Sequence, residues 1–302
     1  MPPDFVVNVR FYPPPEDLRR FLTTFYITEI EVDGDGGGVT DALQPEWANL
    51  RFLSGDSPVC WNAAGDRIEG TNFVATGPST RSTNFRLGRS RTWGMGLLPL
   101  GWAQFIRVPA ANHANLIANG NSHPSFASFA PLAAQLFGSV PDEAAELARL
   151  IAHFRGMLGK MVGDAERICA IQEALIDPNL ATVAQLVERV GVGLRTIERL
   201  CHRACGFAPK QLLRRQRFLR SLSQYLLDPS LKWIGAIDSH YHDQAQFVRD
   251  FHEFMGMTPR EYAALAHPVL AKFIHERARV VGAPQQAGGW AEGDAGLAAL
   301  EI

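Results

Sequence analysis

The chain has 302 residues, 46% of them hydrophobic and 20% charged, which is enough apolar material for two domains. Its 29 Lys and Arg residues face 31 Asp and Glu, so the net charge of −2 excludes a uniformly basic, histone-like protein. The same balance still allows a nucleic-acid binder whose positive charge lies on one face.

The first residues include an early acid and no long apolar stretch, so we expect no secretory signal. No apolar run reaches about 18 residues, and we therefore expect no membrane-spanning helix and no membrane partner. The cysteines are too few for a disulfide framework: Cys60, Cys169, Cys201 and Cys205. These features predict a soluble, reduced protein of the cytoplasm.

Residues 1–140 are rich in Gly, Pro, Asn and Ser, with short apolar runs between turn signals. Such runs are typical of strands in a sandwich or small barrel. We expect strands at 21–27, 49–53, 73–76, 92–98 and 102–108. The run DGDGGG at 33–38 predicts a surface turn and not a phosphate loop, because no glycine-rich strand-to-helix motif follows it. We interpret 1–140 as a β-rich sensor or regulatory domain.

From residue 141 onward the apolar periodicity is helical. A helix over 142–161 would carry its apolar residues on one side: Leu147, Leu150, Ile151, Phe154 and Leu158. Residues 141–163 would form a linker whose helix either mediates dimerisation or packs between domains. Residues 268–302 are predicted to be a tail that is disordered in part, above all from 282 onward.

The second half contains an internal repeat with an offset of 50 residues. Each copy reads as helix, tight turn, helix, and then G-x-x-P followed by a basic residue. Matched pairs are Arg199 and Arg249, Gly206 and Gly256, Pro209 and Pro259, and Lys210 and Arg260. We expect two helix-turn-helix units, at about 182–203 and 231–254, inside a domain spanning 164–267.

In the first unit, Thr182 and Gln185 have the spacing of a capping box that begins a helix. Residues 191–193 form a turn of the length that a helix-turn-helix needs. The next helix would turn Leu194, Ile197, Leu200 and Cys201 inward. Its opposite stripe consists of Arg195, Glu198, Arg199 and His202, and a helix with such polar side chains outside fits a DNA major groove.

The second unit repeats this design. Asp243 can cap a helix with Gln246 three residues later, and Phe247, Phe251 and Phe254 would face inward as core residues. The outward positions are Ala245, Val248, Arg249 and His252, with Gln244 at the helix start. Thr258, Pro259 and Glu261 then predict the start of a further helix.

A continuous helix over 209–227 would join the two units. Nineteen residues span roughly 28 Å, which approaches the spacing of about 34 Å between successive major grooves on one side of a duplex. Residues 189–220 contain nine basic residues and one acid, Glu198, so positive charge is concentrated here. This helix could therefore hold both reading helices on one face of DNA.

Residues 164–267 resemble the C-terminal DNA-binding domain of AraC-type transcriptional regulators. The match is strongest over 241–251 (YHDQAQFVRDF) and 256–262 (GMTPREY). Residues 1–140 resemble the β-rich N-terminal domain of one branch of that family. The resemblance implies an α+β protein of two domains: a β-rich, sandwich- or barrel-like N-terminal domain and an all-α double helix-turn-helix domain.

The resemblance also implies the contacts to DNA. It assigns base-edge contacts to Arg195, Glu198, Arg199, Gln244, Ala245, Val248 and Arg249. For phosphate contacts we expect Thr196, His202, Arg203, Lys210, Arg214, Gln246, His252 and Arg260. Two positions depart from the family: Gly193 replaces a usual capping Ser, and His240 replaces a usual Gly in a turn that would favour positive φ.

The expected function is a sequence-specific regulator that binds double-stranded promoter DNA. Further candidate partners are a small-molecule effector, a second copy of the chain and RNA polymerase. Two alternatives stay open: an enzyme in the β domain that the helices target to DNA, and an interaction module whose basic helices bind an acidic partner. Glu198 could accept a hydrogen bond from a cytosine or form an ion pair with neighbouring residues.

No catalytic residues, cofactor or metal site are expected. Cys201 and Cys205 with His202 between them lack a second pair of ligands, and His113 and His123 have no acidic cluster nearby. The aromatic residues of the N-terminal half could line a ligand cavity or form ordinary core: Trp47, Trp61, Trp93 and Trp102.

Overall fold

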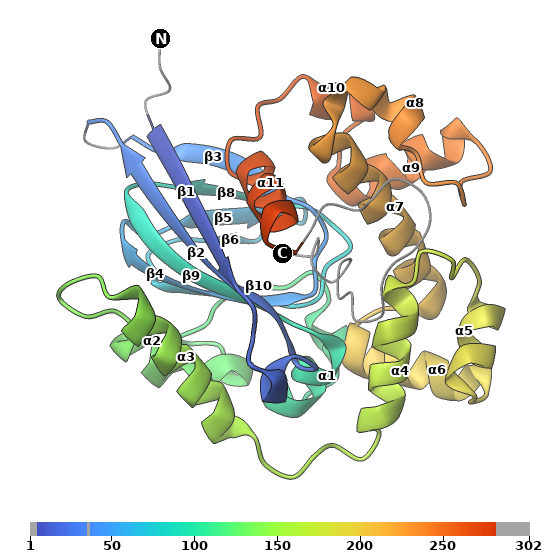
Figure 1. Cartoon of the computed structure of the whole chain (residues 1–302), viewed down its shortest axis with the longest axis horizontal. Helices are drawn as coiled ribbons and strands as arrows, with labels where there is room; N and C mark the ends of the chain where they lie inside the picture. The colour runs from blue at the N-terminus through green and yellow to red at the C-terminus, as the bar shows by residue number, and fades with distance from the viewer. Residues whose placement is uncertain (1–4, 35–36, 282–302) are drawn as a thin grey trace.

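The computed structural model describes residues 5–34 and 37–281. A β-rich N-terminal half lies beside a helical C-terminal half (Figure 1). This confirms the expected α+β class, with β-rich sheets followed by helices.

Two antiparallel sheets form the N-terminal half. The larger has the order β1 (Phe5–Tyr12), β2 (Leu22–Val32), β9 (Ser90–Leu97), β4 (Ala48–Gly55), β7 (Phe73–Thr76) and β10 (Ile117–Asn119). The smaller has the order β3 (Val39–Leu43), β8 (Thr83–Leu87), β5 (Val59–Asn62) and β6 (Arg67–Ile68). The strands expected at 21–27, 49–53, 73–76 and 92–98 are thus confirmed as β2, β4, β7 and β9.

Strand β2 has buried residues on both faces because both faces are covered. Phe25 and Ile27 face one core, which includes the helices that follow the sheet, while Tyr26 and Ile30 face a second core between the sheets. Alternate side chains of a strand point to opposite faces, so a central strand of a three-layer arrangement can place apolar residues in both cores.

The strand expected at 102–108 is wrong. The chain forms a short helix α1 (Pro99–Gly101) that continues as a π-helical turn (Trp102–Ile106) and ends at Arg107 in the left-handed region. Pro99 occupies the first helical turn, where its fixed φ and missing N–H favour a helix start. Short 3₁₀ turns and α2 (Ala130–Gln135) follow.

Helix α3 (Glu143–Met157) packs on the larger sheet (Figure 1). It is shorter than the expected 142–161, and Asp142 caps its start by accepting from the Ala145 N–H. The Phe154 ring lies 6.3 Å from that of Phe25, and the Trp93 Nε1 donates to the buried Glu146 carboxylate at 2.6 Å. One face of α3 therefore serves packing within the N-terminal half; dimerisation through it stays a prediction.

The C-terminal half is helical. Its helices are α4 (Ala165–Ile176), α5 (Val183–Val190), α6 (Leu194–Leu200), α7 (Pro209–Leu227), α8 (Lys232–Ala236), α9 (Gln244–Met255), α10 (Pro259–Ala263) and α11 (Leu270–Val281). Helix α11 turns back onto β1, and the Phe273 ring meets the Phe11 ring edge-on at 5.6 Å. Part of the expected tail is thus an ordered helix, while 282–302 lie outside the described residues.

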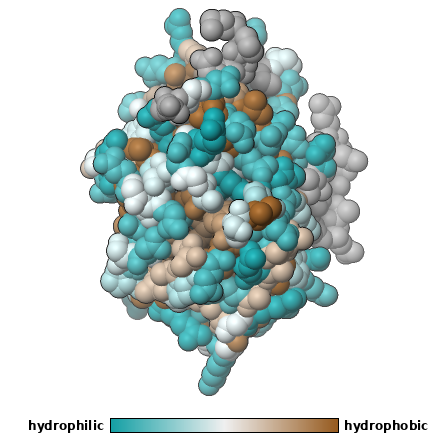
Figure 2. All heavy atoms as spheres, turned by 90° about the vertical axis from the view of Figure 1, so that its left-hand side faces the viewer, coloured by the Kyte–Doolittle hydropathy of each residue, from teal (hydrophilic) through white to brown (hydrophobic). Residues whose placement is uncertain are grey.

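The tryptophans Trp47, Trp93 and Trp102 are buried, and none of the four considered lines the apolar cavity found between the sheets. They are core residues, and the cavity lies elsewhere. Figure 2 shows that the outer face of the N-terminal half is mostly hydrophilic, with apolar residues in scattered groups.

Candidate DNA-binding interface

The first helix-turn-helix unit consists of α5, a turn at 191–193 and α6. The capping box is present, since Thr182 accepts from the Gln185 N–H and the Gln185 side chain accepts from the Thr182 N–H. Gly191 has a φ of 71°, a left-handed conformation that lets the chain leave α5 without strain. Ile197 and Leu200 are buried as expected.

Leu194, expected on the inner face, is 48% exposed. It is the first residue of α6 and directly follows Gly193, which has no side chain. Gly193 caps α6 without a side-chain hydrogen bond, in agreement with the missing Ser.

Helix α6 presents the predicted base-reading stripe to solvent. Arg195 and Glu198 are exposed, and their side chains make no hydrogen bond or ion pair within the described residues. Arg199 and Arg203 both contact the Asp164 carboxylate, at 3.4 and 3.2 Å. The ion pair considered for Glu198 is therefore absent from the part of the chain that the structure describes.

The second unit consists of α8, a connecting turn and α9. Asp243 caps α9 by accepting from the Gln246 N–H, as expected. Phe247, Phe251 and Phe254 are buried, which confirms them as core residues. On the outer side Gln244, Ala245, Arg249 and His252 are exposed, and Val248 is half-buried.

His240 does not adopt the expected positive φ. Its backbone N–H and its Nδ1 contact the Asp238 carboxylate at 2.9 and 3.0 Å. The pKa of Asp238 is lowered: burial alone would raise it, but the Arg220 guanidinium and the His240 N–H outweigh that effect. The Asp238 carboxylate thus holds this turn together without a positive φ at residue 240.

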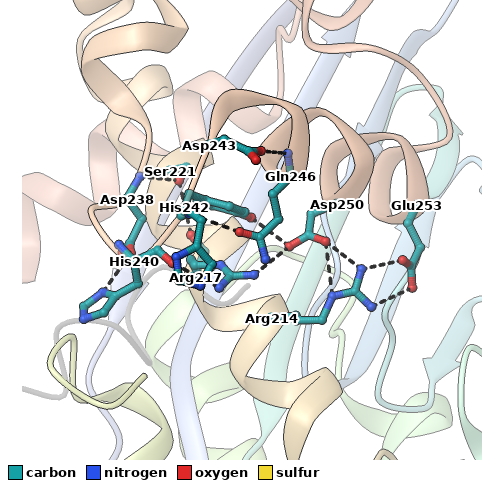
Figure 3. A network of polar contacts seen from close by, with 11 residues as sticks. Arg214, Arg217, Ser221, Asp238, His240, His242, Asp243, Gln246, Asp250 and Glu253 are labelled. Carbon is teal, nitrogen blue, oxygen red and sulfur yellow. Dashed lines mark hydrogen bonds and ion pairs between the residues drawn. The ribbon is translucent and has the colours of Figure 1, made fainter. Parts of the chain in front are cut away.

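Helix α7 spans Pro209–Leu227, as predicted, but many of its arginines face the second unit instead of solvent. Figure 3 shows Arg214 and Arg217 converging on Asp250 of α9. Their guanidinium groups lie 2.6 and 3.1 Å from its carboxylate, and the Tyr241 hydroxyl donates to it at 3.1 Å. Arg214 also reaches Glu253.

These contacts show that the basic segment 189–220 is less available to DNA than its composition suggests. Arg220 binds Asp238 and Arg189 binds Asp177, so much of its positive charge is neutralised within the domain. The acids Asp238, Asp250 and Glu253 are visible in the sequence, but their partners lie 18 to 39 residues away. Among the lysines and arginines predicted to contact DNA, those that are exposed and form no ion pair within the described residues are Arg195, Lys210, Arg249 and Arg260.

The cysteine and histidine candidates have ordinary packing roles. Cys201 and Cys205 are fully buried. Cys60, in the N-terminal half, is buried as well, and this burial raises the pKa of its thiol to about 11. His113 Nε2 lies 2.8 Å from the Ser125 hydroxyl. No group of three His, Cys, Asp or Glu side chains able to hold a metal occurs among the described residues.

None of the helices in the part of the chain that the structure describes is both long and apolar enough to span a membrane.

Two helix-turn-helix units on a common connecting helix, each with an exposed polar helix face, define the class of helix-turn-helix DNA-binding domains. Residues 186–264 match the model of the family described as "Helix-turn-helix domain". This region is a helix-turn-helix domain of the AraC type, which confirms the resemblance drawn from the sequence.

Three solved structures illustrate the similarity. ToxT from Vibrio cholerae O395 is 13% identical, with 86% of this chain and 96% of that chain covered and a TM-score of 0.41. Wild-type ToxT from Vibrio cholerae strain SCE256, bound to an unsaturated fatty acid, is 11% identical, with 85% and 94% covered and a TM-score of 0.39. The AraC-like transcriptional activator CuxR is 14% identical, with 71% and 86% covered and a TM-score of 0.29. No curated protein is significantly similar in sequence.

Proposed function

We propose that this protein regulates transcription by binding double-stranded DNA with both helix-turn-helix units at once. One observation carries the proposal: α6 and α9 each present an exposed polar face, and α7 follows α6 in the chain and binds α9 through the buried Asp250 carboxylate. A rigid connection of two reading helices favours binding to two half-sites on the same duplex. Its place of action would be the cytoplasm.

Within this proposal the predicted contacts fall into two groups. Arg195, Lys210, Arg249 and Arg260 are exposed without an internal ion pair, so they can meet DNA directly. Arg199, Arg203 and Arg214 already contact carboxylates and would have to exchange or share them. The first group should therefore supply most of the attraction to phosphates and bases. The remaining assignments rest on the sequence and the family resemblance: Thr196, Glu198, His202, Gln244, Ala245, Gln246, Val248 and His252.

We further propose that the cavity between the sheets receives an effector. It has a volume of about 60 Å³ and is lined mainly by apolar side chains, among them Leu53, Val74, Phe85 and Phe273, together with four threonines. The Arg51 guanidinium at its wall lies 2.7 Å from the Glu46 carboxylate, so the cavity offers no uncompensated charge. These features favour a small, uncharged, apolar molecule. Because the cavity is small, the side chains that line it would have to move apart to admit such a molecule.

The proposal is tested by selecting bound sequences from a random duplex library with the whole chain. We expect a motif of two half-sites, and an affinity that falls steeply with salt because Lys and Arg displace counterions from phosphates. Arg67→Ala, which removes an exposed arginine of the N-terminal half, serves as the control and should leave the motif unchanged.

Failure to bind duplex at low salt would contradict the proposal. It would favour the alternative of an acidic protein partner for the basic helices.

A further inference from the structure

Residues 77–82 connect β7 of the larger sheet to β8 of the smaller one. All of them except Arg81 are buried, although they form a loop. They are buried because the loop enters the helical half, where it meets the first unit, helix α7 and the second unit.

The contact with the first unit is at Gly206, directly after the π-helical turn that extends α6. Gly206 has a φ of 85°, and a Cβ added there would lie 3.3 Å from the Pro78 ring and 3.4 Å from the Ala110 carbonyl oxygen. The absence of a side chain thus permits the close approach of loop and helix end.

The contact with α7 centres on Arg215, whose side chain is fully buried. Its Nη1 donates to the carbonyl oxygens of Ser79 and Glu46, at 3.1 and 3.2 Å. Its guanidinium carbon lies 3.9 Å from the centroid of the Trp47 ring. The Gln211 side chain, one turn earlier, lies 3.4 Å from the Thr80 hydroxyl. A buried cation with these partners holds the connecting helix to the loop.

The contact with the second unit is at the end of the reading helix α9. The Ser82 N–H donates to the Phe254 carbonyl at 2.8 Å, and the Ser82 hydroxyl lies 3.2 Å from the Met255 carbonyl oxygen. The last carbonyls of a helix have no partners within the helix, so Ser82 supplies a cap from the other half of the molecule.

We propose that loop 77–82 is a clamp that sets the distance and orientation between the two reading helices, and thereby the spacing of the two half-sites that the protein accepts. The inference rests on the proposed DNA-binding function. The half-site sequences are read by α6 and α9 themselves, so the clamp governs spacing and not base preference.

The test repeats the duplex selection with Arg215→Met, which keeps a long apolar stem but removes the hydrogen bonds to Ser79 and Glu46. The wild-type chain should select one spacing between half-motifs. Arg215→Met should select the same half-motifs at several neighbouring spacings, with affinity for a single half-site within about twofold of wild type. Arg81→Ala, in the exposed position of the same loop, should retain the wild-type spacing.

Ser82→Ala combined with Gln211→Ala provides a second, milder variant should Arg215→Met fail to fold, as judged by circular dichroism. It should broaden the spacing to a smaller extent. An unchanged single spacing in a folded clamp variant would overturn the clamp alone. A wild-type chain that enriches no motif would instead overturn the proposed function.

Discussion

Asp250 concentrates several interactions in one buried carboxylate. It accepts from Arg214, Arg217 and the Tyr241 hydroxyl while only 3% of its side chain is exposed. A buried charge is tolerated when its partners compensate for the lost solvation, and removing one partner leaves the others unpaired. The same geometry makes the site sensitive to substitution.

We predict that Asp250→Ala destabilises the chain by about 3–5 kcal/mol, because two arginines lose their buried counter-ion. Urea denaturation followed by circular dichroism measures the effect. Glu253→Gln is the matched control: its side chain is 43% exposed and, among the described residues, pairs with Arg214 only, so about 1 kcal/mol or less is expected. Equal effects of the two substitutions would contradict the central role of Asp250.

Substitutions of Arg195 and of Lys210 would distinguish contacts to base edges from contacts to phosphates. Arg195→Ala should cost about 1–3 kcal/mol of DNA binding and relax the selected base at one position. Lys210→Ala should weaken binding to all sequences similarly and reduce the salt slope by about 1. Titrations of the selected duplex and of a scrambled duplex at several salt concentrations compare them. If Arg195→Ala leaves the preferred bases unchanged, its assignment to a base edge is wrong.

Helix α11 is held to the N-terminal half by a cap from a distant strand. Asp41 of β3 accepts from the backbone N–H groups of Val269 and Leu270, at 2.9 and 2.8 Å. His267 Nδ1 lies 3.3 Å from the same carboxylate, and its ring stacks on Tyr262 at 3.9 Å. A carboxylate at the start of a helix satisfies N–H groups that otherwise lack partners.

This arrangement predicts that the docking of α11 depends on pH. Burial alone would lower the pKa of His267, but the hydrogen bonds to Asp41 and to the Tyr262 carbonyl outweigh it and raise that pKa above 6.5. A raised pKa in the folded state means that the stabilisation is complete below about pH 6.5 and is lost as the pH rises through the raised value.

Hydrogen exchange of the Val269 and Leu270 amides, corrected for intrinsic rates, should therefore show stronger protection at pH 6 than at pH 8. His267→Gln keeps a donor for Asp41 but does not titrate, so the difference between the two pH values should shrink. A wild-type protection that is independent of pH would rule out this role of His267.

At the scale of the whole molecule, the segment that follows the DNA-binding domain returns to the N-terminal half. It includes α11, and it forms part of the wall of the cavity between the sheets. Val269 and Phe273 of this segment line the cavity, and the Phe273 ring meets the Tyr26 ring edge-on at 4.9 Å. A molecule bound in the cavity would therefore contact this C-terminal segment directly.

Phe273→Ala should destabilise the chain by about 3–5 kcal/mol by removing a buried ring and enlarging the cavity. Because an enlarged apolar cavity binds small apolar molecules, benzene should restore part of the lost thermal stability. Thermal denaturation with and without benzene tests both effects. Leu265→Ala, at a position 52% exposed, should change little and should not respond to benzene. Absence of a benzene effect in Phe273→Ala would contradict an apolar, closed cavity.

Local patterns in the sequence were sufficient for several helices of the helical half, although not for α4 or α11. The capping residues Thr182, Asp243 and Thr258 and the helix over 209–227 follow from spacings of three and four residues, which one helical turn brings together. The wrong strand at 102–108 has the opposite cause: a short apolar run fits either element, and its tertiary surroundings favour the helix.

The tertiary structure alone decided which partners meet across the molecule. Arg215 binds Ser79 at a separation of 136 residues, and Asp41 binds Leu270 at a separation of 229. The sequence does not show whether a charged or polar residue faces solvent, DNA or a distant carbonyl group. Only the packing of the two halves removes water from these groups, and once they are buried each of them requires a specific partner.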